Sequence, residues 1–144
     1  MKQRKQVGAI AYQDDPAVGL RILLVTSRET GRWVIPKGWP MKAKRPHQAA
    51  EQEAFEEAGI EGRIAKKATG CYHYPKRLRS GEVIACRVKV FAMTVDRLAG
   101  TWPEALERRR EWFTPEEAAN AVQEPELAEL LRSLQQRIET PKAS

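Results

Sequence analysis

Apolar residues recur along this chain in short runs that are typical of β-strands. Continuous apolar stretches predict strands at residues 7–12, 20–26 and 33–35, and a turn-forming DDP separates the first two. Farther along, we expect strands at residues 63–74 and 82–95, and a short one at 111–113. Within the longest of these, apolar residues alternate with small or charged ones, as in Ile84, Cys86, Val88 and Val90. Such alternation indicates a strand with one buried face.

A helical pattern follows the third predicted strand, after a loop. Residues 36–45 contain prolines and a glycine that exclude regular structure, so we expect a loop there. Residues 46–58 are rich in Ala, Glu and Gln, and Pro46 suits the first turn of a helix. Gly59 stands where a left-handed C-terminal cap belongs. The sequence therefore predicts a helix that begins at residue 46 and ends before residue 59.

Two further helical signals lie near the C-terminal end. Thr114 and Glu117 have the spacing of a capping box, which predicts a short helix after residue 114. A last helix is expected over about 125–138, with an apolar stripe for core packing formed by Leu127, Leu130, Leu131, Leu134 and Ile138. Strands and helices thus alternate without a linker or repeat. We predict a mixed α+β fold in a single domain, 1–144, with a loose tail at about 139–144.

Charge and composition narrow the class of partner. The chain has 25 Lys and Arg against 19 Asp and Glu, a net charge of +6, which suits a polyanionic partner such as a polyphosphate, nucleotide or nucleic acid. No apolar run approaches the about 20 residues of a membrane span, and no signal peptide is visible, so we expect a cytoplasmic protein without a membrane partner. Cys71 and Cys86 lack the spacing of a zinc site or disulfide framework, and we interpret them as reduced packing residues.

Against this basic background, the predicted helix at 46–58 concentrates negative charge. Because a helix advances about 100° per residue, Glu53, Glu56 and Glu57 share one face. No Lys or Arg lies one turn away within that helix to offset their repulsion. A cation from outside the helix should neutralise them. Mg²⁺ suits this role, because it prefers oxygen ligands and is usually held by one or two carboxylates together with substrate phosphates.

These residues support a family resemblance. The segment GWPMKAKRPHQAAEQEAFEEAGI, residues 38–60, resembles the Nudix box, the signature of hydrolases that cleave a nucleoside diphosphate linked to another group. The resemblance implies a Nudix-type α/β/α sandwich with a mixed sheet between helices. The signature's glutamates match Glu53, Glu56 and Glu57, while Lys44 and Gln52 replace its usual Glu and Arg. We interpret this paired loss as a compensated change of the loop, although Lys44 could lower metal affinity or add a phosphate contact.

A narrower resemblance implies substrate contacts. The segments RWVIPKGWP and WPEALERRREWFTPEEA are similar to the diphosphoinositol polyphosphate phosphohydrolase branch, whose members also cleave diadenosine polyphosphates. In that branch a basic cluster before Glu-Trp-Phe reaches the phosphates, which indicates Arg110 first among the arginines at 108–110. By the same resemblance Ser27 and Arg28 are candidate phosphate contacts, and Lys5 is a weaker one. Lys37 in the basic loop is also a candidate, and ordinary surface charge is an equally open interpretation of each.

The resemblance also implies a mechanism. Glu53 and Glu57 are expected to bind Mg²⁺, or alternatively Mn²⁺, with help from the backbone carbonyl of Gly38. A carboxylate base then positions a water for attack on phosphorus. Glu56 is the first candidate for this base and Glu104 the second. The expected activity is Mg²⁺-dependent hydrolysis of a phosphoanhydride in a small polyphosphate, with nucleic acid only as a substrate.

Other readings of the sequence are also open. A Nudix domain that binds a nucleotide or RNA without hydrolysis is the alternative, although the chain shows no RNA-recognition motif of the usual types. His47 and His73 lack the setting of a catalytic triad, and we expect structural or exposed roles for both. Tyr72 and Tyr74 could contact a substrate ring or pack in the core.

Overall fold

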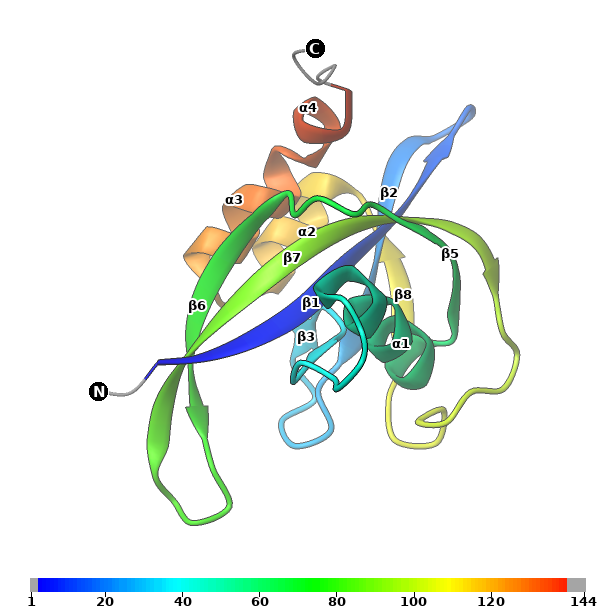
Figure 1. The fold of residues 1–144 in the computed structure, drawn as a ribbon. Coiled ribbons are helices and arrows are strands. Elements are labelled where there is room, and N and C mark those ends of the chain that lie inside the picture. Colours follow the sequence, from blue (N-terminus) through cyan, green and yellow to red (C-terminus); the bar gives the residue numbers. More distant parts are fainter. Residues whose placement is uncertain (1–2, 140–144) are drawn as a thin grey trace.

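The protein folds around one mixed β-sheet. The structure, a computed structural model, describes residues 3–139. Its strands follow the central order β3-β2-β1-β7-β5, while β4 pairs with β1, β6 with β7 and β8 with β2 (Figure 1). Only the central pair β1–β7 is parallel among the described pairs. The strands are β1 Gln3–Asp15, β2 Gly19–Thr26, β3 Trp33–Val34, β4 Lys37–Gly38, β5 Ile60–Ile64, β6 Gly70–Arg77, β7 Val83–Leu98 and β8 Arg110–Phe113.

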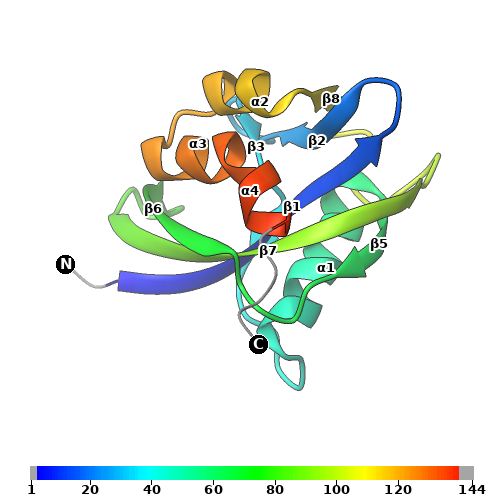
Figure 2. The same cartoon turned by 90° about the horizontal axis from the view of Figure 1, so that it is seen from above.

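Helices cover both faces of the sheet. Figure 2 shows α2 (Pro115–Ala121), α3 (Pro125–Arg132) and α4 (Leu134–Glu139) on one side, and α1 (Pro46–Ala58) on the other. Two apolar clusters fill the spaces between the layers. The α/β/α sandwich predicted from the sequence is confirmed.

The alternation of side chains on β1 and β7 explains why the sheet has two cores. On β1, Ile10 belongs to the cluster under α2 and α3, whereas its neighbours Ala9 and Ala11 belong to the cluster under α1. On β7, Val90 and Phe91 divide in the same way. Successive residues of a strand point to opposite faces, so a strand that is apolar at every position can be buried on both. The continuous apolar run at 7–12 has this physical origin.

One predicted strand, 63–74, is wrong, because the chain forms β5 and β6 there instead. Both strands pair antiparallel with β7, and Ile64 faces Met93 while Gly70 faces Val90. Between these two pairs, the chain runs six residues from Ile64 to Gly70, whereas β7 covers only three residues. The extra residues form a bent connection, which the apolar pattern by itself does not reveal.

The predicted last helix, 125–138, is also divided in two. Ser133 separates α3 from α4. Its hydroxyl donates to the carbonyl of Glu129 and accepts from Nε of Arg137. A serine that bonds to the preceding turn bends a helix. The predicted apolar stripe is confirmed, since its leucines are buried and Ile138 packs against them.

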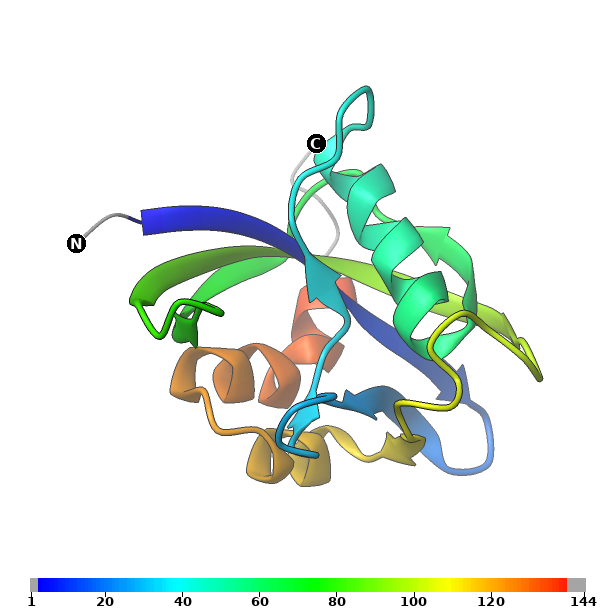
Figure 3. The same ribbon diagram turned by 90° about the horizontal axis from the view of Figure 1, so that it is seen from below.

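The loop predicted at 36–45 contains a short strand, β4, that the sequence did not indicate. β4 pairs with β1, with Gly38 opposite Val7 and Lys37 opposite Gly8. Figure 3 shows this cyan segment passing beside α1. Helix α1 itself has the predicted bounds, and Gly59 caps it in the left-handed conformation at φ 66°. Gly38 is thus held against the helix that carries the acidic residues.

Residues 3–139 contain no helix that is long and apolar enough to cross a membrane. Of the tail predicted to be loose, Glu139 ends α4 and residues 140–144 lie outside the described residues. Cys71 and Cys86 are both free thiols, in agreement with the sequence analysis.

The capping box at the start of α2 is confirmed and can be tested. The backbone N–H of Glu117 donates to the Thr114 hydroxyl, and the Glu117 carboxylate accepts from the Thr114 N–H. Thr114→Ala should lower the free energy of unfolding by about 1 kcal/mol, because a helix donor loses its partner. Urea unfolding followed by circular dichroism measures the change, with Thr114→Ser as a matched control. An alanine variant as stable as the serine variant would contradict this role of the hydroxyl.

Candidate active site

Of the two predicted metal-binding glutamates, Glu53 lies against the backbone of Gly38, and Glu57 is hydrogen-bonded to Glu53. Glu53 and Glu57 lie one turn apart on α1, on the side that faces β4. A Cβ atom on Gly38 would overlap the carboxylate of Glu53. Only glycine therefore allows this carboxylate to lie directly against the β4 backbone. The pairing of β4 with β1 fixes the backbone from the other side.

Burial raises the pKa values of both glutamates in this pair. Glu57 is only 6% exposed. Burial raises the pKa of Glu57 to about 8, the nearby Arg108 guanidinium opposes the shift, and a hydrogen bond with Glu53 adds to it. Burial also raises the pKa of Glu53. Carboxyl groups in such contact repel each other when both are ionised, unless a proton or a cation lies between them.

The donor set suits a hard divalent cation. Among residues 3–139, no three His, Cys, Asp or Glu side chains converge in the manner of an all-protein metal site. What converges instead is the pair of carboxyl groups beside the Gly38 backbone. Mg²⁺ needs only one or two protein carboxylates when water and substrate phosphates supply its other ligands. The arrangement therefore fits a metal that is shared with a phosphorylated substrate.

Arg108 connects the acidic pair to a third carboxylate. Its Nε donates to Oε1 of Glu104 at 2.7 Å, and its Nη1 donates to the carbonyl of Thr26 at 2.9 Å. Its Nη2 lies 3.8 Å from Oε1 of Glu57, which is too long for a direct hydrogen bond. Arg28 reaches the same oxygen of Glu104 at 3.8 Å. Arg108 thus holds Glu104 in place and leaves Glu57 without a tight ion pair.

A cavity of about 410 Å³ opens in front of these groups. It brings together seven of the residues that the sequence singled out: Ser27, Arg28, Lys37, Gly38, Glu53, Glu57 and Glu104. The remaining wall adds four cations, one carboxylate and several uncharged residues; the charged ones are Arg32, Lys76, Arg77, Arg108 and Glu29. Burial lowers the pKa of Lys37, whose ammonium lies 4.9 Å from the centre of the Tyr74 ring. The site therefore combines a buried acidic centre with a basic surround.

Three predicted residues do not line this cavity. Lys5 is exposed on β1, next to Gln6, and the alternation of the strand directs the two side chains to opposite faces. Glu56 is half-buried, and its Oε2 accepts a hydrogen bond from Nε2 of Gln52 at 2.7 Å. Arg110 lies at the C-terminal end of α1 and not among the cations that line the cavity.

Arg110 stabilises the C-terminal end of α1. Its Nη1 donates to the carbonyl of Ala58 at 2.8 Å, and its guanidinium stacks 3.9 Å from the centre of the Trp102 ring. The indole N–H of Trp102 donates to the carbonyl of Glu57 at 2.9 Å. These donors satisfy carbonyls that a helix end leaves without partners. The arginine that faces the cavity is Arg108, two residues earlier in the same basic cluster.

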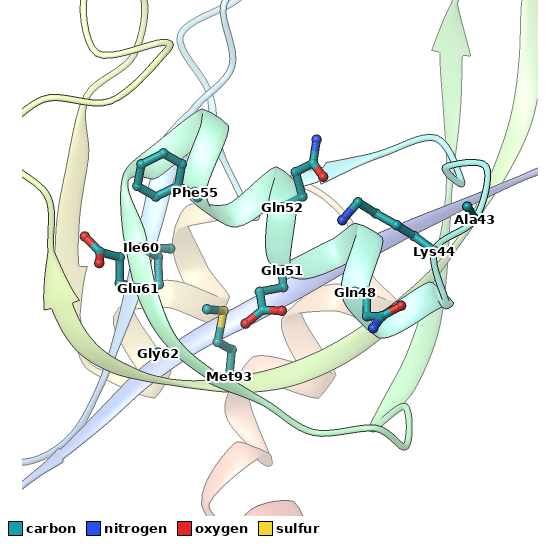
Figure 4. Close-up of a pocket in the computed structure, with 10 residues that line it drawn as sticks. All are labelled: Ala43, Lys44, Gln48, Glu51, Gln52, Phe55, Ile60, Glu61, Gly62 and Met93. Atoms are coloured by element: carbon teal, nitrogen blue, oxygen red, sulfur yellow. The ribbon is translucent and has the colours of Figure 1, made fainter.

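The two departures from the family signature lie on another side of α1. Figure 4 shows Lys44 and Gln52 at a second hollow, of about 470 Å³, with Phe55 and Met93 also in its wall. Neither Lys44 nor Gln52 lines the cavity with Glu53 and Glu57. The positive charge of Lys44 is therefore not part of the acidic centre.

Some cavity residues were not singled out as site residues. Trp39, Gln6, Lys76 and Arg77 are examples. A period-two pattern on β6 was the available signal, since Tyr74 and Lys76 share a face. Tyr72 is buried in the core, whereas Tyr74 lines the cavity. His73 is exposed and contacts Glu126, in agreement with a structural role.

Comparisons with known proteins identify the family of this chain. The family model described as the NUDIX domain matches residues 2–134. Mouse diphosphoinositol polyphosphate phosphohydrolase 3-alpha is 32% identical over 117 residues, which cover 78% of this chain and 67% of that protein. The mitochondrial Nudix hydrolase 16 of Arabidopsis thaliana is 30% identical over 115 residues, which cover 78% of this chain and 63% of that protein.

Solved structures agree in fold. The structure of a binary complex of C. elegans Ap4A hydrolase has a TM-score of 0.68 at 21% identity, and the match covers 94% of this chain and 97% of that one. The family model, the sequence relatives and the fold point to the same family. The chain therefore belongs to the Nudix hydrolase family.

Proposed function

We propose that this chain is a Mg²⁺-dependent pyrophosphohydrolase that cleaves a phosphoanhydride bond in a small polyphosphate substrate. Diadenosine polyphosphates and diphosphoinositol polyphosphates are the candidate substrates, in line with the names of its relatives. The observation that carries the proposal is the Glu53–Glu57 pair, with Glu53 against Gly38, at a cavity that several cations line. A divalent cation would neutralise the repulsion between the two carboxylates, and the cations along the wall suit an anionic substrate.

Glu53 and Glu57 are the residues that would hold the metal, with the carbonyl oxygen of Gly38 as a further donor. Bound there, a divalent cation neutralises phosphate charge and lowers the pKa of water. The surrounding cations bind the rest of the phosphate chain, and Arg28 and Lys37, which both precede Gly38 in sequence, line the same cavity. With the metal and the cations in these roles, the protein needs to supply little covalent chemistry, because phosphoryl transfer depends mainly on positioning and electrostatics.

For the base that activates water, the cavity favours Glu104 over Glu56. Glu104 lines the cavity. Glu56 does not, and its carboxylate accepts a hydrogen bond from Gln52 within α1. Arg28 and Arg108 both contact Oε1 of Glu104, so we assign the proton from water to its Oε2. A base must lie within hydrogen-bond reach of the proton that it accepts. From the sequence, Glu56 was the first candidate for the base and Glu104 the second.

The Glu57→Gln variant tests the proposed metal centre. It should abolish Mg²⁺-dependent phosphate release, because an amide cannot supply the negative charge that holds the cation. The assay uses a panel of diadenosine polyphosphates, diphosphoinositol polyphosphates and nucleoside triphosphates at several Mg²⁺ concentrations. Circular dichroism serves to check that the variant is folded. Turnover near the wild-type rate would refute the assignment, and absence of wild-type turnover with retained nucleotide binding would favour a binding module.

The choice of base is tested with a matched pair of variants. Glu104→Gln should lower kcat by about 100-fold or more, because general-base catalysis contributes about 10²- to 10⁴-fold. Glu56→Gln should lower kcat less than about tenfold, because that carboxylate does not line the cavity. Steady-state kinetics at saturating Mg²⁺ measures both. A larger loss in Glu56→Gln than in Glu104→Gln would reverse the assignment.

The raised pKa of Glu57 predicts how stability depends on pH in the presence of EDTA. The pKa is about 8 in the folded protein and near its ordinary value of 4.5 in the unfolded chain. The folded state thus binds the proton more tightly, so this contribution is complete below about pH 4.5 and is lost as pH rises through about 8. Urea unfolding should show a smaller decline between pH 5 and 8.5 in Glu57→Gln than in the wild type. Equal declines would show that Glu57 ionises freely.

A further inference from the structure

A third hollow, at the N-terminal end of α1, gathers basic side chains. It has a volume of about 350 Å³, and none of its lining residues belongs to the cavity beside Glu53 and Glu57. No Asp or Glu of the described chain lines it. We call this place the basic hollow. The cations in its wall are Arg45, Lys66, Lys67 and Lys89.

The bent connection between β5 and β6 supplies two of these cations (Figure 1). At its start, the backbone N–H of Ala65 donates to the carbonyl of Ala92 on β7 at 2.9 Å. At its end, the backbone N–H of Thr69 donates to the carbonyl of Val90 at 2.7 Å. The three residues between, 66–68, are exposed. Because both ends of the connection are bonded to β7, its lysines are held at a defined place beside the start of α1.

The four cations of the basic hollow have no acidic partner. Within residues 3–139, none of them forms an ion pair. Exposed arginines elsewhere on the surface do have such partners, as in Arg63–Asp96, Arg97–Glu61 and Arg132–Glu116. Like charges that share one hollow repel each other, and this repulsion opposes the compact state. A bound anion would remove it.

The positive surface continues along the sheet. Phe91 belongs to the cluster under α1, so the alternation of β7 directs Lys89 and Arg87 to the same face. Lys5 on β1 is paired with Arg87 in the strand register, which places two like charges side by side. The first turn of α1 contains no acidic residue, although the N-terminal end of a helix carries partial positive charge. Strand, connection and helix thus all present positive charge here.

The shape of the basic hollow favours a compact ligand over a strand of nucleic acid. Its volume lies near the lower end of the range for small-ligand pockets. Phe91, in its wall, is only 2% exposed, so this ring offers no free face on which a nucleobase could stack. Lysine and arginine side chains bind phosphate through charge-assisted hydrogen bonds. The hollow therefore suits an anion that is rich in phosphate and has no flat ring to place.

From this convergence we propose that the basic hollow is a second anion-binding site, which takes a compact anion with several phosphate groups and is separate from the site proposed for hydrolysis. Arg45, Lys67 and Lys89 come from three different parts of the chain, so one anion with several phosphates can bridge them. The glutamates of α1 take no part in this binding. The second site is therefore independent of whether the chain hydrolyses a phosphoanhydride.

An NMR titration with inorganic tripolyphosphate tests this site. The isotope-labelled protein is kept in EDTA, so that no divalent cation draws phosphate to the glutamates. Backbone amide signals close to Arg45, Lys67 and Lys89 should shift and saturate, and high salt should weaken the binding. The double variant Lys66→Ala/Lys67→Ala should raise the Kd obtained from these signals about 5- to 30-fold, as expected for the loss of two exposed charge contacts. Signals of Ser27 and Lys37 report separately on the other cavity.

The double variant Arg79→Ala/Arg132→Ala is the charge-matched control. It removes two exposed cations that line neither the basic hollow nor the cavity beside Glu53 and Glu57. It should bind tripolyphosphate at the basic hollow as the wild type does, and thermal unfolding verifies that both variants are folded. The proposal is overturned if the signals around the hollow do not shift, if the lysine variant keeps the wild-type Kd, or if the control loses as much affinity.

A short uridine oligonucleotide with the same number of phosphates distinguishes the two kinds of ligand. It should bind the basic hollow more weakly than tripolyphosphate, because its phosphates are spread along a chain and its bases find no stacking surface there. Tighter binding of the oligonucleotide, seen in the same amide signals, would make nucleic acid the ligand and would contradict the assignment of a compact anion.

Discussion

The contact of a carboxyl group with a backbone that has no side chain is the constraint on which this site depends. Glu53 can lie against Gly38 only because a Cβ atom there is missing, and the buried Glu57 is hydrogen-bonded to Glu53. Burial makes their ionisation costly, as the raised pKa of Glu57 shows. A proton or a cation between the two carboxyl groups would relieve their repulsion. In the proposed function, a divalent cation held by these few protein ligands would keep positions open for phosphate oxygens.

Keeping the pair in register requires the C-terminal end of α1 to be fixed. The segment after β7 supplies hydrogen-bond donors to the last three carbonyls of α1. The backbone N–H of Glu104 donates to the carbonyl of Glu56, and the indole N–H of Trp102 donates to the carbonyl of Glu57. The guanidinium of Arg110 donates to the carbonyl of Ala58. The same segment carries Arg108 and Glu104 into the cavity. The same segment therefore both caps helix α1 and positions the candidate base, Glu104. A shift of this segment would move both halves of the site together.

The basic residues of the chain have divided roles once the fold is known. Arg28 and Arg108 line the cavity and contact Glu104 there. Arg110 serves the helix end instead, and Lys44 lies at the hollow on the other side of α1. A net charge of +6 therefore favours an anionic partner but does not indicate where it would bind. The exposed indole of Trp39 adds an apolar surface to the wall of this cavity.

The sequence by itself determined the features that depend on neighbours within a few residues. Helix α1 with its Gly59 cap, the capping box at Thr114, the shared face of the glutamates and the family signature all have this local origin. Tertiary structure decided what depends on strand register, which joins residues far apart in the chain: the break between β5 and β6, the choice of Arg108 over Arg110, and the position of Glu104 in the cavity. Periodicity tells which face a residue occupies, but the side chain that it meets there is set by the packing of distant elements.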